Sequence, residues 1–240
     1  MRRFQLSRHI SRFYLGLMPL ASTVDISATY IPSGVYTHRA RSLKKTRDTV
    51  LRNMSTNKQV LMQAQPPRPN SCTYWVTENL IAGEYPADAA GELATRRKLR
   101  HYLDKGITAF VDLTHEGEKP AYSQILMEEA IQMGIDANEI KHTRLPILDM
   151  NIPKQERMNE ILDSIESAIK EGRKVYVHCR GGIGRTGTAV GCFLVRNGYS
   201  GDDALSELNR LFKFSDRSYE SYQSPETSDQ INFVRNFRTS

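Results

Sequence analysis

The fold of this chain can be predicted from one stretch, Val175-Tyr-Val-His-Cys-Arg-Gly-Gly-Ile-Gly-Arg-Thr-Gly187. An alternating apolar run ends at a cysteine, and three glycines, an arginine and a threonine follow it. A second apolar run then extends from Ala189 to Val195. This order predicts a buried strand, a tight loop and a buried helix.

The loop in this stretch has the composition of an anion-binding site. A glycine-rich loop that runs into a helix N-terminus directs several backbone N–H groups at one point, which suits a phosphate-sized anion. Such a field lowers the pKa of a thiol from about 8.5 towards roughly 3.5–7.5, and Cys179 stands at the mouth of the loop. Arg185, on its far side, can hold two phosphate oxygens in a geometry that lysine lacks.

These residues resemble a known family. The sequence His178-Cys179, five further residues and Arg185-Thr186-Gly187 is similar to the signature loop of the cysteine-dependent protein tyrosine and dual-specificity phosphatases. The resemblance implies that Cys179 attacks phosphorus and forms a phosphocysteine intermediate, while Arg185 binds the transferring phosphoryl group. The Thr186 hydroxyl would stabilise the thiolate as a leaving group, and His178 would hold the loop and lower the cysteine pKa. The phosphate-binding loop would comprise Arg180, Gly181, Gly182, Ile183, Gly184 and Arg185.

Cys179 has two other interpretations. A free cysteine in a glycine-rich turn before a core helix is the simplest alternative. A redox or zinc site is excluded because no second cysteine lies at Cys-x-x-Cys spacing. No metal or cofactor is implied, because the loop and Arg185 already supply the charge stabilisation.

Cleavage of a phosphate ester also needs a proton donor for the departing oxygen. The family usually supplies an aspartate from a mobile loop about thirty residues before the cysteine. Asp149 occupies that place, in a loop that ends at Pro153. A capping or solvated aspartate before a helix is the alternative, and Asp112 is the rival acid, although it lies within an apolar strand run. The loop lacks the Trp-Pro-Asp triplet of the classical tyrosine phosphatases.

Gln230 resembles a glutamine with which some family members position the hydrolytic water. An exposed glutamine in the first turn of a C-terminal helix is the alternative. His115, Glu116 and Glu118 follow a predicted strand and are candidates to line the cleft, although solvated loop charges are the default interpretation.

The remaining elements alternate between helices and buried strands. We expect a hairpin of Tyr74–Val76 and Leu80–Ala82, helices at 86–105, 122–133, 153–172, from 202 and at 231–237, and strands at 107–113 and 139–145. This order predicts an α/β fold with a mostly parallel central sheet flanked by helices. The resemblance implies a compact, dual-specificity-like phosphatase domain at 72–240.

The basic charge is confined to one end of the chain. Residues 1–53 carry ten Lys or Arg and two Asp, whereas the rest of the chain carries 23 Lys or Arg against 25 Asp or Glu. We therefore expect no nucleic-acid-binding domain. Residues 1–65 are interpreted as a basic extension that is a disordered tail, a transit peptide or sequence upstream of a start at Met54. The proline-rich 65–69 segment is predicted to be a stiff linker.

The composition fits a soluble globular protein, with 39% hydrophobic and 25% charged residues. No apolar run approaches the ~18 residues of a membrane span. Three cysteines make no disulfide framework, and Cys192 is expected in the core. A thiolate nucleophile favours a reducing compartment, so we expect a cytoplasmic protein, or an organellar one if residues 1–53 are a transit peptide.

The predicted function is hydrolysis of phosphotyrosine, and also of phosphoserine and phosphothreonine, in protein or peptide substrates. The segment from Cys72 is short for a classical tyrosine phosphatase and lacks the Lys-Asn-Arg-Tyr segment that deepens the phosphotyrosine pocket. Two alternatives remain: a phosphoinositide or RNA 5′-phosphate phosphatase, and a phospho-binding module without catalysis. The first would need further basic residues in the loop, where Arg180 alone accompanies Arg185.

Overall fold

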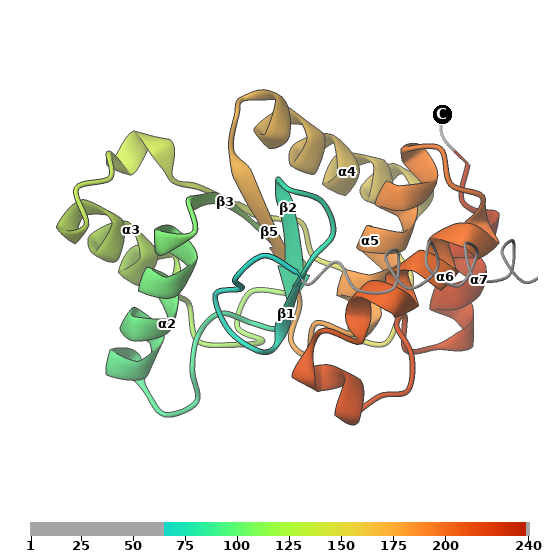
Figure 1. Cartoon of the computed structure of the whole chain (residues 1–240), viewed down its shortest axis with the longest axis horizontal. Coiled ribbons are helices and arrows are strands. Elements are labelled where there is room, and N and C mark those ends of the chain that lie inside the picture. Colours follow the sequence, from blue (N-terminus) through green and yellow to red (C-terminus); the bar gives the residue numbers. More distant parts are fainter. Residues whose placement is uncertain (1–64, 239–240) are drawn as a thin grey trace, which may run out of the picture. The chain divides into compact units, whose positions relative to one another are not determined.

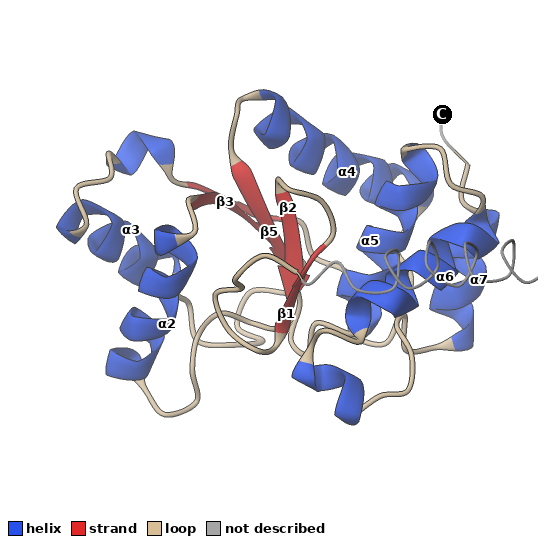
Figure 2. Ribbon diagram, in the orientation of Figure 1, coloured by secondary structure: helices blue, strands red, loops and turns tan. Residues whose placement is uncertain are grey.

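A five-stranded sheet forms the centre of the computed structural model, which describes residues 65–238 (Figures 1 and 2). The strand order is β1-β2-β5-β3-β4, with β1 antiparallel to β2 and every other pair parallel. The strands are β1 Thr73–Trp75, β2 Leu80–Gly83, β3 Ile107–Asp112, β4 Lys141–Arg144 and β5 Lys174–His178. The expectations for residues 1–64 lie outside the described residues.

Helices cover both faces of the sheet. Figure 1 shows α2 and α3 on one side and α4, α5, α6 and α7 on the other. Their bounds are α2 Glu92–Asp104, α3 Ser123–Gln132, α4 Gln155–Lys170, α5 Gly184–Arg196, α6 Gly201–Phe212 and α7 Ser228–Asn236, with short 3-10 helices at Ala137–Glu139 and Asp216–Tyr219. The predicted α/β fold with a mostly parallel sheet is confirmed. Within residues 65–238, no helix is long and apolar enough to span a membrane.

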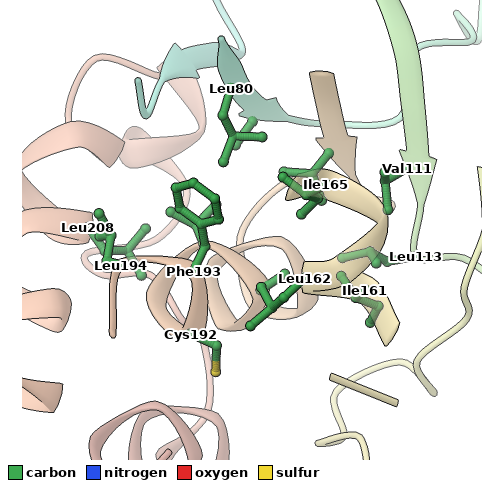
Figure 3. Close-up of a cluster of buried hydrophobic side chains, with 14 of the residues drawn as sticks. Leu80, Val111, Leu113, Ile161, Leu162, Ile165, Cys192, Phe193, Leu194 and Leu208 are labelled. Carbon is green, nitrogen blue, oxygen red and sulfur yellow. The ribbon is translucent and has the colours of Figure 1, made fainter. Parts of the chain in front are cut away.

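Alternation along the strands divides the apolar side chains into two cores. Val175 and Val177 of β5 pack towards α4 and α5, whereas Tyr176 packs towards α2 and α3. Figure 3 shows the larger core, in which Leu80 and Val111 from the strands face Ile165 of α4 and Phe193 of α5. Both faces of β5 are buried, so the strand before Cys179 is held from both sides.

Cys192 lies in the larger core, as predicted (Figure 3). Its side chain is fully buried, and this burial raises the pKa of the thiol far above its ordinary value. Because the thiolate is the reactive form of cysteine, Cys192 is a packing residue and no competitor of Cys179.

Several elements differ from their expected bounds by a few residues; the helix expected at 153–172, for example, is Gln155–Lys170 and that expected at 231–237 is Ser228–Asn236. Two of the differences have a clear local cause. The helix expected from residue 86 begins at Glu92, because Gly91 has a φ of 106° and the Asp88 carboxylate accepts the Ala90 N–H to form a turn. The strand expected from residue 139 begins at Lys141, since the Asp136 carboxylate accepts the Asn138 N–H and starts a 3-10 turn. Polar side chains that bond to nearby backbone explain both differences.

The segment before β1, predicted as a linker, is bonded to the domain. The Gln65 amide pairs with the backbone N–H and C=O of Trp75, at 2.6 and 2.8 Å. The Arg68 guanidinium donates to the Thr73 carbonyl at 2.6 Å and also to the Phe214 carbonyl. These contacts join the segment both to β1 and to the chain after α6.

Candidate active site

Cys179 follows the last residue of β5, at the carboxyl end of the strand between β2 and β3. Open α/β sheets gather their functional loops at this end. The thiol is 3% exposed, and the Gly182 N–H donates to its Sγ at 3.3 Å. Gly182 has a φ of 74°, and a Cβ there would lie 2.4 Å from the Gly83 carbonyl carbon. Only glycine allows the loop to turn and to pack this closely on β2.

Arg185 lies in the first turn of α5 and is the largest fully buried side chain of the described chain. Its Nη1 and Nη2 donate to both oxygens of Glu118, at 2.8 and 2.6 Å. Nη1 also donates to the Ile147 carbonyl at 3.2 Å, and Nη2 lies 2.8 Å from Asp149 Oδ1. Its Nε is buried without a partner, so one donor remains for an anion.

The Arg185–Glu118 pair is strongly ionic. The Arg185 guanidinium lowers the pKa of the Glu118 carboxyl. Burial lowers the pKa of the Arg185 guanidinium, but Glu118 outweighs that effect and the net shift is upward. A bidentate arginine–carboxylate pair fixes orientation as well as charge. Glu118 therefore determines how Arg185 is presented.

Asp149 reaches the site from the loop between β4 and α4. Its side chain is 50% exposed, and its Oδ1 accepts the Met150 N–H at 3.1 Å. The helix-cap alternative is excluded, because the residue before α4 is Lys154. Cys179, Arg185 and Asp149 line one pocket of about 490 Å³, so three separate segments bring the predicted catalytic groups together.

Asp112, the rival acid, does not line that pocket. It is fully buried at the end of β3, where it accepts hydrogen bonds from Thr114 and, at 3.2 Å, from Arg144. Burial raises the pKa of the Asp112 carboxyl, but His142, His178 and Thr114 outweigh it and hold that pKa well below its usual range. A buried, ionised carboxylate is a structural group and a poor acid.

His178 is buried beneath the loop, and its surroundings bear on the expectation that it lowers the pKa of Cys179. Its Nε2 lies 2.6 Å from the Tyr122 hydroxyl. Burial is the main cause that lowers the pKa of the imidazole to about 4. A neutral imidazole cannot lower the Cys179 pKa through a positive charge, so only the structural part of the predicted role fits this geometry.

Thr186 and Gln230 are both buried at the site, and Gln230 lines the pocket together with Cys179. The Thr186 hydroxyl is buried and has no hydrogen-bond partner, so it makes no bond to Cys179 Sγ in this structure. Gln230 is fully buried rather than exposed. Its Oε1 accepts from the Glu226 and Thr227 N–H groups, and its Nε2 donates to the Asn151 carbonyl at 3.2 Å. The amide thus caps α7 and ties it to the Asp149 loop.

Several lining residues were not predicted from the sequence. These are Lys119, Met150, Arg217, Glu220 and Glu226. Each belongs to a segment remote from the glycine-rich loop, and no local pattern marks it. Lys119 and Arg217, together with Arg180, also line an adjoining cavity of about 290 Å³.

Comparisons with known proteins agree with this geometry. A family model described as "Polymorphic toxin system, DSP-PTPase phosphatase" matches residues 87–199. Protein 067L of Invertebrate iridescent virus 3, which carries a tyrosine phosphatase name, is 31% identical over 130 residues, covering 52% of this chain and 46% of that protein. Protein tyrosine phosphatase domain-containing protein 1 of Mus musculus is 27% identical over 125 residues, which cover 50% of this chain and 16% of that protein. The chain thus matches less than two thirds of the length of either relative.

Solved structures share the fold. Tk-PTP in its active form gives a TM-score of 0.54 at 24% identity, covering 69% of this chain and 95% of that chain. PTPMT1 in complex with PI(5)P gives 0.52 at 16% identity, covering 69% and 94%. At these identities the likeness concerns the arrangement of the helices and strands.

Proposed function

The chain belongs to the cysteine-dependent protein tyrosine and dual-specificity phosphatases, and on that premise we propose that it hydrolyses phosphotyrosine in protein substrates. Phosphoserine and phosphothreonine are the expected further substrates. The observation that supports this most is the convergence of Cys179, Arg185 and Asp149 on one pocket. A nucleophile, an anion-binding arginine and a proton donor are the groups that phosphate-ester cleavage requires.

In the first step the Cys179 thiolate attacks phosphorus. An S–P bond forms while the bond to the substrate oxygen breaks, and Asp149 gives that oxygen a proton. The loop N–H groups and the free Nε of Arg185 bind the non-bridging oxygens. Asp149 is protonated in this step, so its ion pair with Arg185 is exchanged for one between Arg185 and the phosphoryl group.

In the second step a water attacks the phosphocysteine. The S–P bond breaks, the thiolate leaves, and the carboxylate of Asp149 takes the proton of the water. The same carboxyl thus acts as acid and then as base. We assign the activation of this water to Asp149 rather than to Gln230, because the Gln230 amide already bonds to Glu226, Thr227 and Asn151.

Glu118 acts through Arg185 as a positioning residue. With both Nη atoms held by Glu118, the guanidinium plane is fixed before a phosphoryl group arrives.

The attacking thiolate also requires a reducing environment, which supports a cytoplasmic location. The described chain has three free cysteines and no disulfide.

A phosphoinositide substrate is the second candidate. Lys119 and Arg217 join Arg180 in the pocket, so more cations are present than the loop sequence alone provides. With Arg185 the pocket is lined by four cations, against three carboxylates, those of Asp149, Glu220 and Glu226. One phosphoryl group fits this balance better than a headgroup that carries several phosphates.

Phosphate release from a phosphotyrosine peptide tests the proposal. Cys179→Ser should abolish turnover while phosphate binding remains, because the loop and Arg185 are unchanged. Cys72→Ser is the matched control, since Cys72 is a partly exposed cysteine that does not line the pocket. Turnover by Cys179→Ser protein at the wild-type rate would overturn the proposal.

A further inference from the structure

A second cavity adjoins the pocket of Cys179. The two cavities, about 490 and 290 Å³ in volume, share three lining residues: Lys119, Arg180 and Arg217. All three are cations, and they come from the loop after β3, from the glycine-rich loop and from the 3-10 helix after α6. A substrate that occupies both cavities has to pass this junction.

Two of these cations have no acidic partner. Arg217 pairs with Glu84 and, at 2.6 Å, with Glu220. Within residues 65–238, by contrast, the side chains of Lys119 and Arg180 make no ion pair and no hydrogen bond. An unpaired cation beside a cavity is available to an anion without first breaking a bond.

The backbones that carry these two cations are fixed. Glu118, before Lys119, holds Arg185, and the carbonyl of Pro120, after it, accepts the Tyr85 hydroxyl at 3.0 Å. The Arg180 carbonyl accepts the Tyr85 N–H at 3.1 Å. Tyr85 therefore joins the two segments, and the two charges project from anchored positions. Preorganisation of this kind raises the effect of a surface charge on binding.

We propose that Lys119 and Arg180 form an anion subsite that binds an acidic side chain flanking the phosphorylated residue of a peptide substrate. The proposal rests on the proposed function and specifies its substrate. A carboxylate or a second phosphate on the peptide would supply the anion. The nearby acids that make no ion pair lie off the junction: of these two cavities, Glu226 lines the catalytic pocket alone and Asp88 the adjoining cavity alone.

The surroundings of the junction favour a peptide over a lipid headgroup. Met150, which lines the pocket, is 52% exposed, and its loop neighbours Leu148 and Ile152 are also exposed. Tyr219, in the same 3-10 helix as Arg217, is 89% exposed. Apolar side chains beside a charged subsite suit a peptide with both kinds of residue.

The test compares pairs of phosphotyrosine peptides that carry Glu or Gln at one flanking position, scanned on both sides of the phosphotyrosine. At the best position, kcat/KM of the wild-type protein should be about three- to tenfold higher for the Glu peptide. Lys119→Gln and Arg180→Gln should each reduce that ratio below about twofold, as should high salt. Lys119→Glu should instead favour a peptide with Lys at this position, which loss of folding would not produce.

Lys170→Gln is the matched control. Lys170 is an exposed cation at the end of α4, before β5 begins, whereas the pocket lies after β5 ends. This variant should keep the wild-type ratio. Phosphate release with no preference for the Glu peptide would overturn the subsite but leave the proposed function standing. A preference for the Glu peptide that persists in both Lys119→Gln and Arg180→Gln would have the same meaning. Faster hydrolysis of a short-chain soluble phosphoinositide would assign the subsite to a lipid headgroup. No release from any peptide would overturn the proposed function itself.

Discussion

The two sides of the pocket are held in opposite ways. Beneath the glycine-rich loop, His178, Tyr122 and Asp112 are almost completely buried and bond to fixed partners. Across the pocket, the loop of residues 145–152 that carries Asp149 exposes several of its side chains. Leu148 is 62% exposed there. The nucleophile is therefore held by the folded core, whereas the proton donor stands on an exposed loop and reaches the core through its ion pair with Arg185.

From this contrast we expect substitutions among the buried residues beneath the glycine-rich loop to change the free energy of unfolding. Substitutions in the exposed loop should instead change the rate of catalysis. Local opening has a low free-energy cost where few apolar contacts are made. A loop of this kind can move with the substrate, while the thiolate stays in place.

Arg185 belongs to both sides, so Arg185→Lys should have the largest effect. Lysine cannot hold both oxygens of Glu118 and also bind a phosphoryl group. We expect kcat/KM for a phosphotyrosine peptide to fall by about 10²–10³-fold. Arg196→Lys, on the same helix and paired with Asp163 at 2.5 Å, is the control and should stay near the wild-type value. Similar kinetics for both variants would contradict the assigned role.

Asp149→Asn should change the rate without changing stability. We expect a loss of about 10²-fold or more on a phosphotyrosine peptide and little change on an activated aryl phosphate, whose leaving group needs no proton. The melting temperature should stay at the wild-type value, since Asp149 is half exposed. Asp163→Asn, another exposed aspartate bound to an arginine, serves as control. Equal losses on the two substrates would transfer the acid role to another group.

His178 should affect stability in a pH-dependent way. Its folded pKa of about 4 lies below the ordinary 6.5, so the unfolded chain takes up the proton first as the pH falls. This contribution to the unfolding free energy is complete above about pH 6.5 and is lost towards pH 4, by on the order of 3 kcal/mol. Urea unfolding across this pH range should show that the unfolding free energy of His178→Gln depends less on pH than that of the wild-type protein. His115→Gln, at an exposed histidine, should match wild type, and parallel curves for all three proteins would contradict the assignment.

The smallest effect is expected at Met150, which has a φ of 61°. A residue with a side chain is strained there, by about 1–2 kcal/mol, and glycine is not. Met150→Gly should therefore change the unfolding free energy by less than about 1 kcal/mol, because the greater freedom of glycine offsets the relief of strain. Leu148→Gly, two residues earlier and without a positive φ, should only destabilise. Equal destabilisation by the two changes would show that the turn at Met150 is unstrained.

The sequence predicted what depends on local order. The strand, the glycines and the helix around Cys179 follow one another in the chain, so their pattern identified the nucleophile and Arg185. Asp149 could be proposed because the resemblance to the phosphatase family implies an acid about thirty residues before the cysteine, and its loop lies directly before a clear helix. Periodicity and turn residues are sufficient for features of this kind.

The sequence could not predict which distant polar groups meet. Glu118 is 67 positions from Arg185, and its loop has the composition of a solvated turn. The low pKa of His178 arises from burial against Tyr122, which is 56 positions away. For Gln230 the sequence left open an exposed side chain and one at the active site, and tertiary contacts such as that to the Asn151 carbonyl are what bury it. Tertiary packing determines all three.

Covalent catalysis by Cys179 is the central claim, and a rapid-quench experiment tests it most directly. The protein is mixed with a phosphotyrosine peptide, stopped with acid within the first turnover, digested and analysed by mass spectrometry. We predict a transient phosphate on the peptide that contains Cys179, formed before inorganic phosphate appears and absent from Cys179→Ser. Phosphate release at the same rate with no phosphorylated Cys179 at any time would contradict the account.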